Sequence, residues 1–128
     1  MWLISAGAGN AAFPLTGTFS DMHCVEQEGD VLGTEITLVG GLDGSAYRYF
    51  ALVQFAEGAA GVPHLVPVSV DGAKVRFTAS YLAGFDVEFS GRVSKKGLAG
   101  RWGEPLNESV DLQRRTSFWQ APGDLCYR

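Results

Sequence analysis

Asp86 and Glu88 are the two carboxylates whose spacing most resembles an acid–base couple. They lie in a segment that alternates apolar with polar residues, as a strand does, so both side chains face the same side. Lys74 and Arg76 alternate in the same way in the preceding segment and would lie opposite them. We therefore interpret the two carboxylates as partners in cross-strand ion pairs on a solvated face, not as catalytic groups.

His23 stands beside Cys24, with Asp21 and Glu26 nearby, and these are residue types that bind metal ions. Neighbouring residues of a strand point to opposite faces, however, and His64 is the only other histidine in the sequence. We therefore expect no metal site and no cofactor.

Catalytic motifs are scarce along the rest of the chain. Residues 7–12 match the G-x-G-x-x-A pattern of dinucleotide-binding loops, but Phe13 and Pro14 would stop the helix that must begin there. The sequence has no G-x-S-x-G elbow and no H-E-x-x-H pair. Because no nucleophile is paired with a base, we expect that the protein is not an enzyme.

Strands must position all of these residues. Eight segments alternate apolar with polar residues and are separated by short turns, many of them rich in glycine. Such a pattern predicts an all-β fold, an eight-stranded antiparallel up-and-down meander closed into a small barrel, with a two-sheet β-sandwich as the alternative. The expected strands are Thr16–Gln27, Val31–Val39, Ala46–Phe55, Leu65–Val70, Lys74–Tyr81, Phe85–Ser94, Leu98–Trp102 and Ser109–Trp119.

The length of 128 residues fits a single domain, which we place at residues 15–128. Residues 1–14 are interpreted either as an N-terminal arm or as the remnant of a signal peptide, with a small-x-small site at residues 6–8. The net charge of −4 argues against nucleic acid as a partner, and no apolar run is long enough to predict a transmembrane helix. The oligomeric state is left open.

Aromatic residues fall on the face of the strands that is expected to point inward. They are interleaved with small residues such as Ala51, Ala79, Gly91 and Gly100. Two interpretations stay open: a solid core in which large residues fill the space beside small ones, or an aromatic pocket with tyrosine hydroxyls as anchors. The candidate ligand-binding residues are Tyr47, Tyr49, Phe55, Phe77, Tyr81, Phe89 and Trp102.

Gly17-Thr18-Phe19 near the start and Arg114-Arg115 near the end resemble the calycin-type barrels, which include lipocalins, fatty-acid-binding proteins and avidins. Members of that group open the first strand with Gly-x-Trp and pack an arginine of the last strand over the tryptophan ring; here phenylalanine replaces the tryptophan. The resemblance implies that Gly17, Phe19 and either Arg114 or Arg115 close one end of the barrel. It implies no particular ligand.

Three short segments also resemble small bacterial exported proteins of uncharacterised function. These segments are Gly17-Thr18-Phe19-Ser20-Asp21, Leu98-Ala99-Gly100-Arg101-Trp102 and Ser117-Phe118-Trp119-Gln120.

Cys24 lies on the expected first strand and Cys126 near the end of the chain. Since the first and last strands of a closed barrel are neighbours, the two cysteines could come within bridging distance, although two free thiols are the alternative. A disulfide would indicate an oxidising compartment. We therefore expect a secreted or periplasmic protein, with a cytoplasmic location as the alternative.

The leading functional hypothesis is non-catalytic binding of a small apolar or aromatic ligand inside an exported barrel. The alternative is a protein-interaction or inhibitor protein with a filled core, which would use its loops and the acidic face formed by the N-terminal half.

Overall fold

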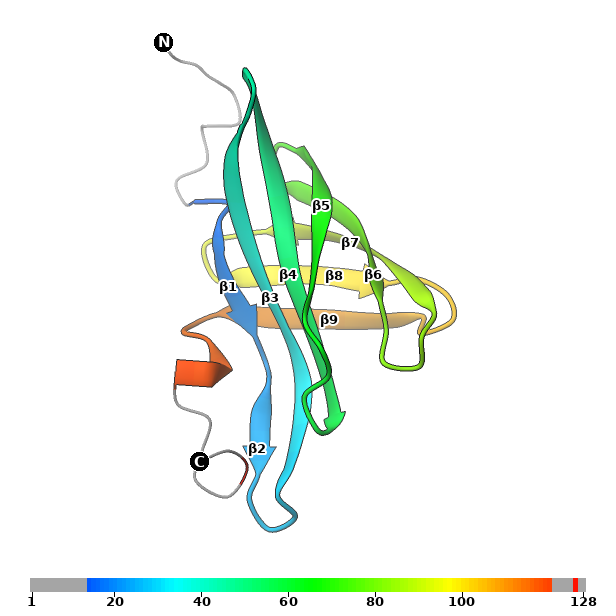
Figure 1. The fold of residues 1–128 in the computed structure, drawn as a ribbon. Helices are drawn as coiled ribbons and strands as arrows, with labels where there is room; N and C mark the ends of the chain where they lie inside the picture. Colours follow the sequence, from blue (N-terminus) through cyan, green and yellow to red (C-terminus); the bar gives the residue numbers. More distant parts are fainter. Residues whose placement is uncertain (1–13, 121–125, 127–128) are drawn as a thin grey trace.

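The chain folds into one antiparallel β-sheet that closes on itself (Figure 1). The structure is a computed structural model that describes residues 14–120 and residue 126, so the interpretation of residues 1–14 lies outside it apart from Pro14. A 3-10 helix, η2 (Phe118–Gln120), follows the last strand. The strands are β1 (Gly17–Ser20), β2 (His23–Val25), β3 (Asp30–Asp43), β4 (Ala46–Gly58), β5 (His64–Asp71), β6 (Lys74–Ser80), β7 (Asp86–Val93), β8 (Gly97–Trp102) and β9 (Glu108–Arg114).

The strand β1 closes the barrel. It pairs with β9 through Phe19–Arg114 on one side and with β3 through Phe19–Ile36 on the other. From β3 to β9 each strand pairs with the next one along the chain, so β1 and β3–β9 form a closed ring of eight, with β2 as one extra strand outside it. The eight-stranded meander is thus confirmed, and the β-sandwich alternative is wrong.

The expected first strand, Thr16–Gln27, is interrupted in the structure. Asp21 causes the break, because its side-chain Oδ1 accepts a hydrogen bond of 2.7 Å from the Thr34 N–H. The backbone N–H of Asp21 also donates to the Thr34 carbonyl, at 3.1 Å. A side chain on Gly33 would collide with the Asp21 backbone, since a Cβ there would lie 2.6 Å from the Asp21 carbonyl oxygen. Glycine at position 33 therefore leaves room for the Asp21 backbone to lie close against β3, between β1 and β2.

The ribbon formed by β3 and β4 is longer than the sequence predicts. Its ladder runs from Val31–Gly58 to Asp43–Ala46, so residues 40–43 continue the strand and do not form a loop. Figure 1 shows this ribbon reaching beyond the rest of the barrel. At its lower end Val31 is buried and Leu32 is 37% exposed, the reverse of the alternation that buries Ile36 and Leu38 further along the strand. The reason is that this end lies outside the ring, where only the outer face is covered.

The C-terminal segment provides that cover. The last strand ends at Arg114, not at the predicted Trp119, and the chain then turns across the outside of β3. Phe118 packs there with Met22, Val31 and Ala56 in a second hydrophobic cluster, separate from the barrel core. The Cys24–Cys126 disulfide, with 6.1 Å between the Cα atoms, joins the segment to β2. The predicted disulfide is confirmed.

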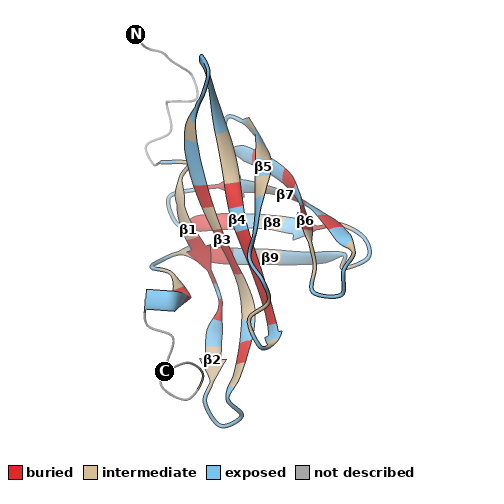
Figure 2. Ribbon diagram, in the orientation of Figure 1, coloured by how far each residue is buried: buried red, intermediate tan, exposed pale blue. Residues whose placement is uncertain are grey.

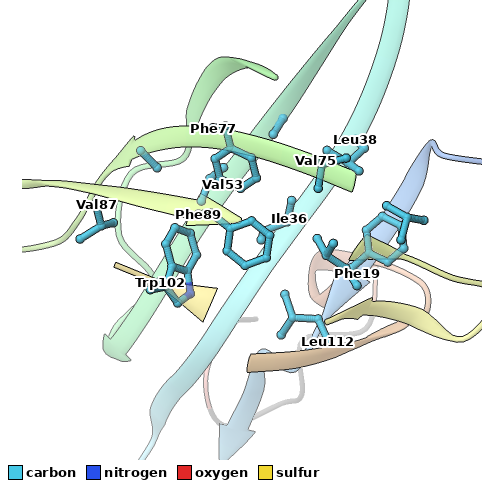
Figure 3. Packing of buried hydrophobic residues seen from close by; sticks show 14 of the residues in the cluster. Phe19, Ile36, Leu38, Val53, Val75, Phe77, Val87, Phe89, Trp102 and Leu112 are labelled. Atoms are coloured by element: carbon cyan, nitrogen blue, oxygen red, sulfur yellow. The ribbon is translucent and has the colours of Figure 1, made fainter. Parts of the chain in front are cut away.

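Buried apolar side chains fill the interior of the barrel (Figures 2 and 3). Every strand of the ring contributes at least one of them except β5, whose valines are only partly buried. Phe89 illustrates how large and small residues alternate. A Cβ on Gly91 would lie 2.6 Å from the Phe89 ring, and one on Gly100 would lie 2.4 Å from it, so both glycines make room for the ring. The fully or nearly buried residues include Phe19, Ile36, Leu38, Ala51, Val53, Val75, Val87, Phe89, Val93, Leu98, Trp102 and Leu112.

Helices contribute little to this fold. In the part of the chain that the structure describes, no helix has the length and apolar character needed to cross a membrane.

Candidate binding sites on the barrel

Five of the seven predicted ligand-binding aromatics form one cluster in the lower half of the barrel. Phe55, Phe77 and Phe89 each contact Trp102, with ring centroids 5.1, 5.9 and 4.9 Å apart. Tyr81 joins the cluster through Phe55, at 4.7 Å. Phe89 and Trp102 are 0% and 1% exposed, so these rings form a buried aromatic core. Figure 3 shows Phe77, Phe89 and Trp102 packed side by side.

Two loops meet at the end of the barrel below this cluster. The Tyr81 hydroxyl donates a hydrogen bond of 2.6 Å to Glu57 Oε2, and Leu82 lies against Gly61, where a Cβ would be 2.2 Å from the leucine Cδ2. Burial and the bond to the Glu57 carboxylate raise the pKa of Tyr81 to about 12. The 56–64 loop and the 81–84 turn therefore lie at the same end of the barrel, and these contacts hold them together.

Tyr47 and Tyr49 lie elsewhere. They pair with Leu42 and Gly40 near the β3–β4 turn, whereas Phe55 pairs with Thr34 toward the other end of the ribbon. Six residues of strand separate Tyr49 from Phe55, which corresponds to about 20 Å. The structure therefore divides the predicted site into an aromatic core and a pair of tyrosines near the opposite end.

These two tyrosines line a cavity of about 430 Å³ at the upper end of the barrel, which we call the tyrosine cavity. Their rings contact each other edge to face, with centroids 5.2 Å apart. Burial, and secondarily the neighbouring Tyr47, raises the pKa of Tyr49. The other lining residues are Leu15, Arg48, Phe50, Pro67, Val68, Val70 and Gly72.

A larger groove of about 710 Å³ follows the line between β5 and β6, and we call it the β5–β6 seam. It is lined by residues 66–69 of β5 and residues 76–78 of β6, with Arg48 and Glu88 at its rims. The cross-strand ladder between the two strands covers only residues 69–71 and 74–76, so the strands separate where the groove lies.

A third cavity, of about 370 Å³, lies between the outer face of β3–β4 and the C-terminal segment. The Trp119 Nε1–H donates to Gln54 Oε1 at 2.7 Å, and Gln54 Nε2–H donates to the Gly61 carbonyl at 2.7 Å. Glu35 accepts from the Ser117 hydroxyl at 2.6 Å and from the Phe118 N–H at 2.7 Å. Buried Glu35 and Gln54 therefore hold the C-terminal segment in place.

Sequence reasoning missed both of these residues. Glu35 and Gln54 are directly opposite each other on β3 and β4, and both are buried. Both fall on positions that alternation assigns to the outer, solvated face. Two features of the C-terminal segment indicate that it covers this face, the adjacent aromatic residues Phe118 and Trp119 and the cysteine at position 126, but alternation predicts a strand as far as Trp119.

The residues implied by the calycin resemblance lie together at the start of β1. The Arg114 guanidinium lies over the Phe19 ring, with its central carbon 4.8 Å from the ring centroid. Gly17 has φ +143°, and a Cβ there would lie 2.7 Å from Arg114 Nη1. Arg115 is exposed beyond the end of β9, and its backbone N–H donates to Thr18. Of the two arginines, Arg114 is therefore the one that covers the ring.

The predicted ion pairs are formed in part. Arg76 bonds to Glu88, with 3.3 Å between Nη2 and Oε2, on the exposed face. Asp86 instead accepts a hydrogen bond from the Ser80 hydroxyl at 3.2 Å, and Lys74 is opposite Arg92. The prediction was wrong for Asp86 because the register of β6 and β7 places Ser80 across from it.

His23 takes part in a local backbone contact. Its Nδ1 lies 2.8 Å from the Asp21 carbonyl oxygen, and the neighbouring Cys24 is bonded to Cys126. Within residues 14–120 and 126, no three side chains of metal-binding type lie close enough together to hold an ion.

Comparison of the chain with protein-family models, with curated proteins and with solved structures found no match. The likeness to calycin-type barrels therefore rests on the closed eight-stranded barrel together with the placement of Gly17, Phe19 and Arg114.

Proposed function

We propose that the protein is a non-catalytic binding protein that takes a small apolar or aromatic ligand in the tyrosine cavity. The observation that carries this proposal is the lining of the cavity, which combines apolar Leu15, Val68 and Val70 with Tyr47 and Tyr49, whose hydroxyls can donate and accept hydrogen bonds. Ligand sites typically are concave and mostly apolar, with a few polar groups that fix orientation, and they measure about 300–1,000 Å³.

The aromatic core is a less favourable place for the ligand. Its rings are in mutual contact, and Phe89 and Trp102 are almost completely excluded from solvent. A ligand would have to separate packed rings to enter it, at a cost comparable to opening a cavity in a core. In this proposal the core provides the rigid support of the barrel, and the tyrosine cavity provides the site.

Fluorescence of the dye anilinonaphthalene sulfonate tests the proposal, because the dye combines aromatic rings with a sulfonate that accepts hydrogen bonds. Tyr47→Phe with Tyr49→Phe removes both hydroxyls and should weaken dye binding by about tenfold. Val68→Trp should block the cavity and abolish binding. An affinity that the two tyrosine substitutions leave unchanged would contradict the proposal.

Tyr81→Phe is the matched control. It removes a hydroxyl of the same kind at the opposite end of the barrel, so it should leave the affinity for the dye unchanged. Native mass spectrometry of protein purified from its own host would then identify a co-purified ligand.

The proposal includes export of the protein. Disulfides persist in oxidising compartments and are rare in reducing ones, and the Cys24–Cys126 bridge supports an extracytoplasmic location. Fractionation of the host, followed by thiol labelling with and without reductant, tests it. A cytoplasmic protein with two reactive thiols would contradict it.

Interaction with another protein is a second candidate, which the outer face of β4 and β5 favours. Leu52 and Leu65 are directly opposite each other there and are 42% and 64% exposed. Leu52 also lines the third cavity, together with Pro63 and Trp119. Exposed apolar surface of this kind often marks an interface.

Sedimentation of the purified protein tests self-association through this face. Leu65→Glu should weaken a dimer, whereas Arg92→Glu on β7, which is not part of this face, should not. A protein that stays monomeric at high concentration would contradict self-association.

A further inference from the structure

The backbone at the β5–β6 seam has hydrogen-bonding groups that face the groove. The turn at 72–73 has two residues, with Gly72 at φ +63°, so the flanking pair Asp71–Lys74 exchanges two backbone hydrogen bonds. Such pairs alternate with pairs that are not hydrogen-bonded along an antiparallel ladder. The next hydrogen-bonded pair is therefore Ser69–Arg76, which is the last pair of the ladder.

Pro67 and Thr78 would form the following hydrogen-bonded pair. Proline has no N–H, so one of the two hydrogen bonds of this pair cannot form. A bond from the Thr78 N–H to the Pro67 carbonyl would still pair Val68 with Phe77, but the ladder does not include that pair. By the same alternation, the N–H and C=O groups of both Thr78 and Ser80 point toward β5, which supplies no ladder partner for them.

The size of the groove fits a strand. Strand geometry gives about 160 Å³ per residue, from a rise of about 3.3 Å, a spacing of about 4.8 Å and a sheet thickness of about 10 Å. On β6 the groove is lined by residues 76–78, and three residues of an added strand would fill about 480 Å³. The groove measures about 710 Å³.

The lining of the groove differs between its two sides. Val66, Val68 and Phe77 face the barrel interior. Arg48 and Arg76 lie toward the outside, where their bonds to carboxylates are exposed and therefore weak. Each guanidinium has five N–H donors, so these bonds leave others for a ligand.

We propose that the β5–β6 seam binds an extended segment of a partner protein, which pairs antiparallel with β6 and alternates apolar with acidic residues. Its apolar side chains contact Val66, Val68 and Phe77, and its acidic side chains face Arg48 and Arg76. Strand addition of this kind gains affinity from main-chain hydrogen bonds and specificity from alternate side chains. This site is separate from the tyrosine cavity, although Arg48, Pro67 and Val68 border both.

A fluorescein-labelled, acetylated hexapeptide that alternates valine with glutamate is the probe. Residues of the peptide that exchange hydrogen bonds with Thr78 and Ser80 have side chains on the same face as Thr78, which is the outer face. These are the glutamates. N-methylation of the glutamates should therefore weaken binding by about tenfold, whereas N-methylation of the valines, the matched control, should have a small effect.

Two measurements on the protein complete the test. Hydrogen exchange of the Thr78 and Ser80 amides should slow when the unmodified peptide is added, and Thr78→Pro should reduce peptide affinity about tenfold. If Thr78→Pro fails to fold, the affinities of the two N-methylated peptides for the wild-type protein still test the proposal. Failure of the unmodified peptide to bind, or equal loss with both N-methylated peptides, would overturn the proposal.

Discussion

The Arg114 guanidinium covers the Phe19 ring at the point where the last strand of the barrel meets the first. Its Nη1 donates to the Thr16 carbonyl at 2.9 Å, and its Nη2 donates to the carbonyls of Pro14 and Ser94 at 2.8 and 3.1 Å. One side chain of β9 therefore joins the segment before β1 to the turn after β7 and caps a buried ring.

Arg114→Met should lower the free energy of unfolding by about 2–4 kcal/mol, because it removes the charge-assisted hydrogen bonds to three carbonyls. Denaturant unfolding measures the change. Arg115→Met is the control: that residue is exposed, and its substitution should change stability by less than about 0.5 kcal/mol. Equal effects of the two substitutions would show that Arg114 does not hold the barrel closed.

Glu35→Gln should loosen the C-terminal segment, because the carboxylate accepts hydrogen bonds from both Ser117 and Phe118. An amide in its place turns an N–H₂ group toward one of these donors, and we expect a loss of about 1–3 kcal/mol. Faster hydrogen exchange of the Phe118 amide reports the loosening. Glu28→Gln, at an exposed turn, should leave that amide unchanged.

Replacing both Cys24 and Cys126 with serine should destabilise the protein by up to about 4–5 kcal/mol, since the disulfide closes a loop with a sequence separation of 102 residues. The loss of protection from hydrogen exchange should differ between the C-terminal segment and the barrel core. The Phe118 amide should exchange much faster, whereas the Phe89 amide in the barrel core should remain the better protected of the two. Equal loss of protection at both amides would contradict a separate C-terminal cluster.

Tyr81 should make stability depend on pH in the alkaline range. Its pKa is about 12 in the folded protein and 10.0 in the reference state, so the unfolded chain loses this proton first. The stabilising contribution is complete below pH 10 and should disappear as pH rises from about 10 to 12. Tyr81→Phe should remove this part of the pH dependence in alkaline denaturation curves. An unchanged curve would mean that the bond to Glu57 does not persist in solution.

Alternation of apolar and polar residues was sufficient to predict the barrel itself. From β4 to β8 the predicted strands agree with the observed ones to within a few residues, because short turns leave little choice of register. Asp71-Gly72 is typical of the two-residue turn that joins β5 and β6, since glycine adopts the positive φ that such a turn requires. Alternation also placed Phe55, Phe77, Phe89 and Trp102 inside the barrel.

Prediction was poorest where the chain leaves the ring. Alternation could not distinguish an outer face open to water from one that another segment covers, so Glu35 and Val31 were assigned to the wrong surroundings. It also could not separate Tyr49 from Phe55, because both lie on the same face of β4 and only the closure of the barrel places one at an end and the other in the core.

By itself, the sequence determined that the chain forms a closed meander of short strands with aromatic residues inside, since local turn chemistry and a period of two require it. The tertiary structure alone decided where a ligand or partner could be received. The tyrosine cavity needs Leu15 beside β4 and β5, and the covered face needs Ser117 beside Glu35, so both depend on residues that are distant in sequence and become neighbours only in the folded barrel. The seam beside Pro67 depends on where the β5–β6 ladder ends, which the turn between the two strands does not fix.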